Sequence, residues 1–173
     1  MLKQSSVCKP VIWLFLFMAV MLIAGQADAQ TKVSGKMTMA YTKLDSLIIA
    51  DTEGHNMGLG ESKGTNASTG DKAFMDGAET TTISYADLTK GNGPHMGYTT
   101  FKKGDDMFIA KWRGDVKTTM TEEGAPKISF NGTFKYIKGA GQFENIKGSG
   151  TYTGHFTSKT EYIVSWESEY SLE

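Results

Sequence analysis

The sequence predicts an all-β protein, a single small antiparallel closed barrel of about eight strands that follows an N-terminal signal peptide. Three observations support this fold class. Apolar and aromatic residues alternate with polar residues at the two-residue period of a half-buried strand. No window after residue 30 carries a helical apolar stripe three turns long. Glycine accounts for 20 of the 173 residues and separates the alternating runs, as in sheets of short strands joined by turns.

The first 29 residues have the composition of a secretory signal peptide. Two lysines precede an apolar run at residues 11–24, and Ala27-Asp28-Ala29 gives the small-x-small pattern of a cleavage site. The run is shorter than the roughly 20 residues of a bilayer-spanning helix, although an uncleaved membrane anchor is the alternative. We therefore expect a signal peptide at 1–29, one barrel domain at 30–173, and an exported protein, periplasmic or secreted, without a stable membrane anchor.

Cysteine content and charge limit the kinds of partner. Cys8 is the only cysteine and falls within the predicted signal peptide, so the mature chain would have no disulfide and would depend on its apolar core. The chain has 18 basic and 19 acidic residues, a net charge of −1, with no basic stripe of the kind that binds nucleic acid. We expect no nucleic-acid partner and no cofactor, and the oligomeric state is left open.

The strand candidates follow one another along the chain. In order, the alternating runs are residues 32–42, 44–51, 95–103, 106–114, 127–139, 148–156 and 160–170. Between them, residues 54–78 are rich in Gly, Ser, Thr and Asn and poor in apolar residues. This composition predicts a short strand through Met57 and Leu59 and then a long mobile loop.

The last two runs predict a hairpin with the three-residue connection Thr157-Ser158-Lys159. A glycine opposite a large aromatic residue leaves room for the ring, and such small–large pairs suit the tapering interior of a small barrel. A phosphate-binding loop is excluded at residues 139–141, because the segment that follows is strand-like and not helical. The predicted pairs are Gly148 with Ser168, Gly150 with Trp166, Tyr152 with Val164 and Gly154 with Tyr162.

Two segments resemble a known family. Residues 139–148, Gly-Ala-Gly-Gln-Phe-Glu-Asn-Ile-Lys-Gly, are similar to the Gly-Thr-Gly-x-Phe-x-x-Ala-x-Gly signature of the allene oxide cyclase-like barrel group, which includes the dirigent proteins. Residues 91–116 resemble its Gly-x-x-x-Gly-Tyr segment and the following strand pair. The resemblance covers residues 91–170 and implies an eight-stranded, calycin-like barrel with an apolar cavity, similar to the lipocalins. The catalytic residues of the plant members have no match here, so no activity is transferred.

The densest titratable cluster is Asp51, Glu53 and His55 in the stretch Asp-Thr-Glu-Gly-His. These three residues share one strand parity, so in an extended chain they project to one side and provide candidate catalytic groups for acid–base chemistry. The alternative interpretation is a polar turn with solvated carboxylates.

Aromatic residues on the apolar parity give the ligand-binding candidates: Trp112, Phe134, Tyr152, Tyr162 and Trp166. They are core residues in a solid barrel and a ligand-facing wall in a hollow one. The predicted function is binding of a small apolar or amphipathic molecule in the cavity. The alternatives are a cyclase or isomerase in which Glu53 or His55 moves a proton, and a cavity-free structural or interaction module.

No metal site is expected. His55, His95 and His155 are far apart in sequence and lack ligand spacing, so we interpret them as turn histidines, with a shared zinc or copper site as the alternative. The methionines, including Met37 and Met39, fit deformable core packing, with a Cu(I) thioether site as the alternative. We interpret the Asn-x-Ser/Thr matches at Asn66 and Asn131 as chance.

Overall fold

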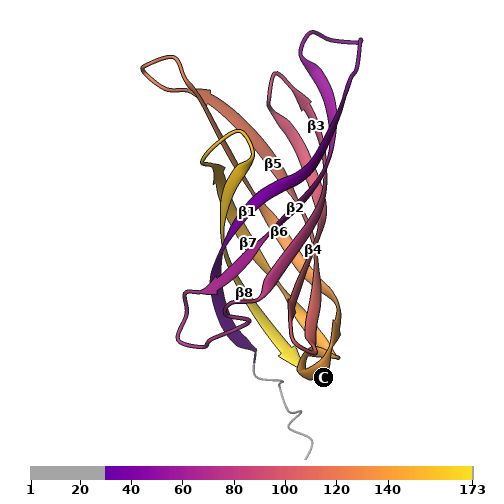
Figure 1. Ribbon diagram of the computed structural model, residues 1–173, viewed down its shortest axis with the longest axis vertical. Helices are drawn as coiled ribbons and strands as arrows, with labels where there is room; N and C mark the ends of the chain where they lie inside the picture. Colours follow the sequence, from indigo (N-terminus) through magenta and orange to yellow (C-terminus); the bar gives the residue numbers. More distant parts are fainter. Residues whose placement is uncertain (1–29, 173) are drawn as a thin grey trace, which may run out of the picture.

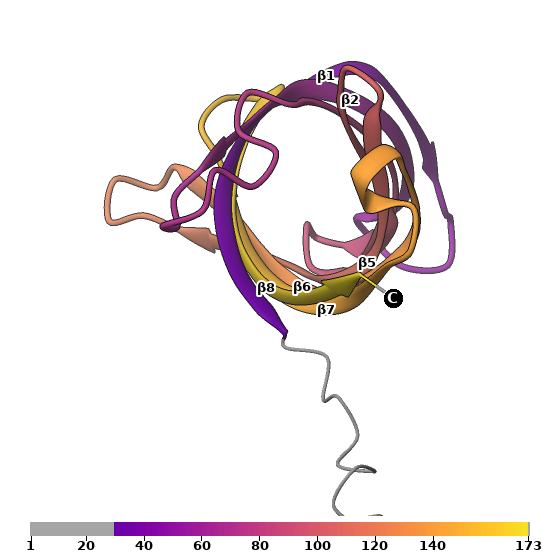
Figure 2. The ribbon, with the colours of Figure 1, turned by 90° about the horizontal axis from the view of Figure 1, so that it is seen from below.

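Eight antiparallel strands close into a barrel (Figures 1 and 2). The computed structural model describes residues 30–172, so the predicted signal peptide with Cys8, and residue 173, lie outside the described residues. Each strand pairs with its neighbours in the chain, and β1 pairs with β8 to complete the circle. The strands are β1 (Thr31–Ile48), β2 (His55–Ser68), β3 (Glu79–Thr89), β4 (Gly93–Lys103), β5 (Asp106–Met120), β6 (Pro126–Ala140), β7 (Ile146–Phe156) and β8 (Glu161–Leu172). The predicted all-β antiparallel barrel is confirmed.

The alternating runs place one set of side chains inside the barrel. In β8, Tyr162, Val164, Trp166 and Ser168 are buried, whereas the intervening Ser165 and Glu167 are exposed. This is the inside–outside alternation that a closed sheet requires, because successive side chains of a strand point to opposite faces. Within residues 30–172, no helix has the length and apolar character needed to cross a membrane.

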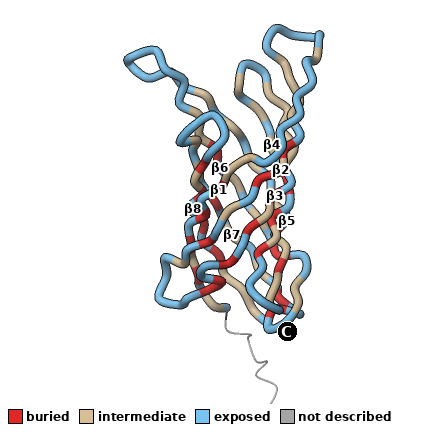
Figure 3. The backbone as a smooth tube through the Cα atoms, viewed as in Figure 1, coloured by how far each residue is buried: buried red, intermediate tan, exposed pale blue. Residues whose placement is uncertain are grey.

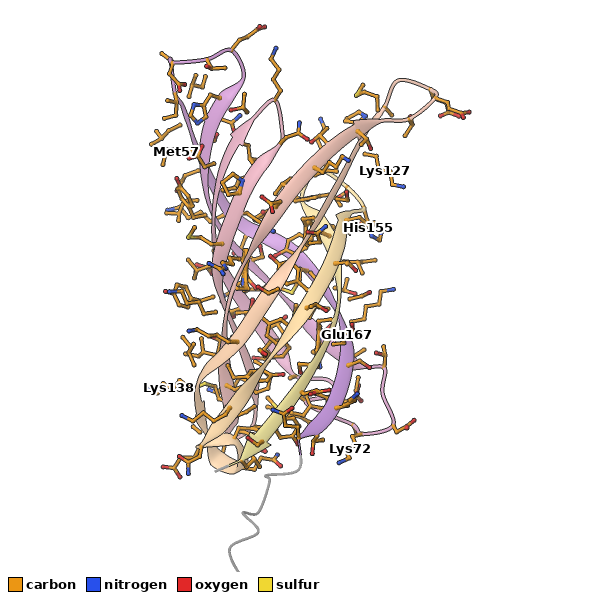
Figure 4. All side chains as sticks on the ribbon, turned by 180° about the vertical axis from the view of Figure 1, so that it is seen from behind. Met57, Lys72, Lys127, Lys138, His155 and Glu167 are labelled. Atoms are coloured by element: carbon orange, nitrogen blue, oxygen red, sulfur yellow. The ribbon has the colours of Figure 1, made fainter. Side chains whose placement is uncertain are left out.

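The two ends of the barrel differ. At the flared end, Figure 1 shows the β1–β2, β3–β4, β5–β6 and β7–β8 connections spreading apart, and Figure 4 places Met57 and Lys127 there. At the other end, here called the plugged end, lie the β2–β3 loop, the β4–β5 turn and the short 3₁₀ helix η2 (Gly141–Phe143). Buried residues occupy the middle of the barrel and the plugged end, while the hairpin tips are exposed (Figure 3).

Residues 54–78 differ from the prediction, because most of this segment is strand β2. Only residues 69–78 form a loop, and this loop turns inward: Phe74 and Met75 are 6% and 4% exposed. The buried Asn66 amide donates to the backbone carbonyls of Met75 at 2.9 Å and Phe74 at 3.3 Å. The predicted long mobile loop is therefore wrong, since two apolar side chains and these hydrogen bonds attach the loop to the barrel.

Strands β7 and β8 form the predicted hairpin, in a register two residues away from the predicted one. Gly150 lies opposite Ser168 and not Trp166. Gly154 lies opposite Val164 and not Tyr162. Because the side-chain period of a strand is two, this shift leaves every side chain on its predicted face. The remaining observed pairs in this stretch are Gly148 with Tyr170, Tyr152 with Trp166 and Phe156 with Tyr162.

The length of the connection explains the register. Five residues, Thr157–Glu161, separate the paired Phe156 and Tyr162, in place of the predicted three. The Ser158 hydroxyl accepts the backbone N–H groups of Thr160 at 3.3 Å and Glu161 at 3.0 Å, and the Thr157 N–H donates to the Glu161 carbonyl at 2.9 Å. A serine that satisfies turn N–H groups in this way is a local feature that strand alternation alone does not reveal.

Glycines do lie opposite aromatic residues, with partners other than the predicted ones. In five directly opposed pairs the aromatic side chain lies against the glycine: Gly35 with Trp166, Gly97 with Trp112, Gly132 with Tyr152, Gly150 with Phe134, and Gly154 with Phe130. A methyl group at any of these glycines would overlap the facing aromatic side chain. Each ring therefore covers bare backbone on the neighbouring strand. Because the glycine has no side chain, the ring can lie close to the barrel wall.

The glycine-rich segment at residues 139–148 connects β6 to β7 through η2. Gly141 has φ of +63°, a left-handed conformation that favours glycine. Phe143 and Ile146 are 4% and 3% exposed and help to fill the plugged end. The segment is therefore a compact, anchored turn and not a flexible linker.

Aromatic packing fills the plugged end. The Phe74 ring lies 4.9 Å from Tyr170, 5.3 Å from Phe143, 5.4 Å from Phe108 and 6.0 Å from Trp166, measured between ring centroids. Aromatic pairs of this kind contribute about 0.5–1.5 kcal/mol each beyond the area they bury. This half of the interior is solid, so any internal space lies toward the flared end.

Candidate functional site

A cavity of about 210 Å³ extends from the middle of the barrel toward the flared end. Its lining includes Leu88, Val116 and Ile128 near the flared end, and it continues inward to Phe101 and Tyr136. A cavity of about 150 Å³ holds benzene, and pockets for drug-sized ligands begin at about 300 Å³. The space therefore suits a molecule of about one ring with a few further atoms.

The cavity has two chemically different walls. Strands β5 to β8 contribute mainly aromatic rings, whereas β3 and β4 contribute the hydroxyl groups of Thr82, Ser84 and Thr99. The hydroxyl oxygens of Thr82 and Thr99 are 2.8 Å apart, and the Trp112 indole N–H donates to Thr99 at 3.1 Å. An apolar ligand with a few polar atoms matches this division better than a purely apolar one.

A histidine and a tyrosine meet in the cavity wall. The distance between His95 Nε2 and the Tyr152 hydroxyl oxygen is 3.0 Å. The His95 ring lies 4.9 Å from Trp112 and 5.5 Å from Phe130, between ring centroids. Burial lowers the pKa of His95 to about 4, although a hydrogen bond with the Asn131 backbone opposes the change. Near neutral pH the imidazole is therefore uncharged and able to accept or donate a hydrogen bond.

The tyrosines of the interior remain neutral donors. Burial raises the pKa of Tyr162 to about 12 and raises the pKa of Tyr152 and Tyr136 well above the usual value. Tyr136 and Ser168 share a hydrogen bond of 2.6 Å between their hydroxyl oxygens. These phenols can orient a bound molecule without introducing charge into the cavity.

All the aromatic residues predicted to bind ligand line this cavity: Trp112, Phe134, Tyr152, Tyr162 and Trp166. They differ in how far they are buried and in the contacts that they already make within the barrel. Trp166 is 6% exposed, and its indole N–H donates to Asn66 Oδ1 at 3.0 Å. Through Asn66 it also helps to hold the β2–β3 loop at the plugged end. Trp112 lies against His95 and is only half-buried, which makes it the better reporter of a ligand.

Sequence reasoning missed His95 as a cavity residue and treated it as a turn histidine. The signal that identifies it is parity: His95 shares its face of β4 with Gly97, Thr99 and Phe101, which are buried. Its partner Tyr152 is 57 residues away, so the contact itself depends on the closing of the barrel.

The predicted acidic cluster lies outside the cavity, at the flared end. His55 bridges two carboxylates, with Nδ1 at 2.5 Å from Asp51 and Nε2 at 2.7 Å from Asp87. These bonds raise the pKa of His55, with Asp87 as the larger cause, and the bond to His55 lowers the pKa of Asp51. Both ring nitrogens are occupied, so the arrangement joins the β1–β2 turn to the end of β3 as an ion-paired bridge.

Glu53 does not belong to this bridge. Its side chain is 92% exposed and lies 3.6 Å from the ammonium group of Lys90. The predicted set is thus divided: Asp51 and His55 come together, Glu53 points away, and Asp87 takes its place from β3. None of these four residues lines the cavity.

The described residues show no arrangement of three or more His, Cys, Asp or Glu side chains that could hold a metal ion. Met37 and Met39 are buried in the core, and the Thr80 hydroxyl lies 3.0 Å from the Met39 sulfur. This placement corresponds to the core-packing interpretation of these methionines. The possible glycosylation residue Asn66 is 1% exposed, and Asn131 is exposed on the outer face of β6.

Comparison with known proteins gives a distant similarity in overall shape. No protein-family model matches the chain, and no curated protein sequence matches it. Among solved structures, the chain is similar to the pterocarpan synthase dirigent protein GePTS1, with a TM-score of 0.47 and 13% identity over 98% of each chain. At this score and identity, the likeness assigns neither activity nor ligand to the chain.

Proposed function

We propose that this protein is an exported barrel that binds one small apolar or amphipathic molecule in its interior. The observation that carries the proposal is the aromatic cavity of about 210 Å³. One aromatic ring buries about 150–250 Å² of surface, and apolar burial supplies about 25 cal/mol per Å². Burial of one ring therefore supplies about 4–6 kcal/mol before the cost of association, so the dissociation constant has a lower limit of about 0.05–1 mM.

Two measurements test binding. Native mass spectrometry of the protein purified from its source should detect a co-purifying small molecule. Titration with neutral one-ring compounds should change tryptophan fluorescence saturably, and Trp112→Phe should remove most of the response while Trp166 remains as a fluorophore. The absence of both a bound molecule and any saturable response would leave a structural or interaction module that binds no small molecule as the function.

A cyclase or isomerase that uses the same cavity is the second candidate. It is favoured by the contact between His95 and Tyr152, which places a neutral base and a phenol within proton-transfer distance of each other. The rim residues Glu53 and His55 are less suited to this role, because they lie outside the cavity lining. Incubation of the co-purified molecule with the protein, followed by NMR, would distinguish turnover from binding. A binding module leaves the molecule unchanged.

Export rests on the composition of residues 1–29, with a short apolar run followed by Ala27-Asp28-Ala29. The expected mature protein begins at Gln30. Intact mass measurement of protein recovered from the periplasm or medium tests this cleavage. Full-length protein found in the membrane fraction would favour the uncleaved anchor.

We also infer distant kinship with the allene oxide cyclase-like barrel group. The inference is supported by the signature segment 139–148, where Gly141 adopts a left-handed conformation and Phe143 is buried in the plugged end. The glycine and phenylalanine positions of the signature thus have physical roles in this turn. An alignment of homologues that retained these positions would strengthen the inference, and their free variation would contradict it.

A further inference from the structure

The charge of the cavity wall restricts the ligand. Among the described residues that line the cavity there is no lysine, arginine, aspartate or glutamate. A charged molecule that entered would lose its hydration without gaining a counter-ion, at a cost of several kcal/mol. His95 is the one basic side chain of the lining, and burial lowers its pKa to about 4, so it offers no positive charge near neutral pH. The ligand is therefore expected to be neutral.

The hydrogen-bonding groups of the wall are unequally available. Thr82 and Thr99 bond to each other, and Thr99 also accepts from Trp112. His95 and Tyr152 are bonded to each other, and a hydroxyl group has both a donor and two acceptor positions. A ligand hydroxyl can therefore insert between the two groups in place of their direct bond, donating to the imidazole nitrogen while it accepts from the phenol, a net gain of one hydrogen bond. Trp112 and Phe130 flank the imidazole and provide apolar surface for the rest of the molecule.

We propose that the cavity is specific for a neutral, one-ring alcohol whose hydroxyl group is held between His95 Nε2 and the Tyr152 hydroxyl. This proposal rests on the proposed binding function and names the ligand class and the recognition residues for it. The size of the cavity sets the limit of one ring, and the uncharged lining excludes carboxylates and ammonium groups of the same size. We call His95 and Tyr152 the recognition pair.

The test uses four compounds that share a phenyl ring with one attached carbon: toluene, benzyl alcohol, benzoate and benzylammonium. Each is titrated into the mature protein at pH 7, with tryptophan fluorescence as the readout and ligand-observed NMR as a second measurement. Benzyl alcohol should bind about three- to tenfold more tightly than toluene, the range expected from one net hydrogen bond. Neither ion should show saturable binding.

Variants assign the preference to the recognition pair. In His95→Phe the preference for benzyl alcohol over toluene should fall, because the ligand hydroxyl loses its acceptor and keeps only the Tyr152 phenol. In the double variant His95→Phe/Tyr152→Phe it should fall to about onefold, while toluene binding is kept, because phenylalanine occupies both ring positions without a polar atom. His155→Phe is the matched control: His155 is exposed on β7, also at the flared end, and this change should leave the preference unaltered (Figure 4). Tyr152→Phe, which removes only a hydroxyl, should reduce the preference and provides the test if His95→Phe fails to fold.

The outcomes separate the two proposals. If none of the four compounds binds, the binding function itself fails, and the ligand class fails with it. If toluene and benzyl alcohol bind equally well, the cavity binds ligand but the role of the recognition pair is wrong. Saturable binding of benzoate or benzylammonium would overturn the selection for neutral molecules. An unchanged preference in both His95→Phe and Tyr152→Phe would assign recognition to other groups.

Discussion

Acid should destabilise the folded barrel through His95. Burial lowers the pKa of this side chain to about 4 in the folded state, and its ordinary value is 6.5. The unfolded chain therefore takes up a proton at a higher pH than the folded chain. The sign follows from this order: the free energy of unfolding is unaffected by His95 above about pH 7 and falls as the pH decreases from about 6.5 toward 4.

The loss of stability follows from the difference between the folded-state pKa of His95, about 4, and its ordinary pKa of 6.5. It corresponds to at most about 3 kcal/mol at pH 4 and about 2 kcal/mol at pH 5, since one pKa unit is worth about 1.36 kcal/mol. Part of the ring remains in contact with water, which reduces the effect at pH 5 to about 1–2 kcal/mol. The Asn131 backbone and the negative charge of Asp115 raise the pKa of His95 and so oppose the effect of burial. The folded-state pKa of about 4 already includes both.

The assay is urea unfolding at pH 7, 6 and 5, followed by circular dichroism. Wild-type protein and the His155→Phe control should lose the same stability between pH 7 and pH 5. His95→Phe should lose about 1–2 kcal/mol less, because its unfolded chain has no histidine at this position to take up a proton. Equal losses in all three proteins would refute the reasoning, since they would mean that His95 is charged in the folded state without penalty.

Three further predictions concern other parts of the barrel. Gly35→Ala forces a methyl group into the indole that covers Gly35 and should cost about 1–3 kcal/mol in urea unfolding. Gly58→Ala brings a methyl group only to 3.9 Å from the Asp45 carbonyl oxygen, an ordinary contact, and should stay within about 0.5 kcal/mol; equal effects would contradict the ring-over-glycine packing. Asn66→Ala leaves the buried Trp166 indole N–H unpaired, removes the hydrogen bond to the Met75 carbonyl and should cost about 2–4 kcal/mol in free energy of unfolding. A neutral result would mean that other contacts hold the β2–β3 loop. The pKa of His55 is raised, so the stabilisation that His55 provides is fully present below about pH 6.5 and is lost as the pH rises through the folded-state pKa. His55→Gln should therefore lower Tm more at pH 6 than at pH 9. The control Glu53→Gln should change Tm little at either pH.

The fold class and the faces of the strands could be predicted from the sequence, because both depend on a local property. An alternating run such as Tyr162, Val164 and Trp166 must place its apolar side chains on one face, whatever strand lies beside it. For the same reason, the five aromatic residues predicted to face a ligand do line the cavity, even though the predicted register was wrong by two residues.

The contacts of the candidate site were decided by the tertiary structure. His95 reaches Tyr152 across 57 residues, His55 reaches Asp87 across 32, and Trp166 reaches Asn66 across 100. Each contact requires a particular register around the closed sheet, and the register depends on connection lengths and on single turn residues such as Ser158. Alternation in the sequence is unchanged by a two-residue shift, so it cannot distinguish one set of cross-strand partners from the next. Closure of the barrel selects one set, because the pairing of β1 with β8 must be satisfied together with the seven other strand pairs.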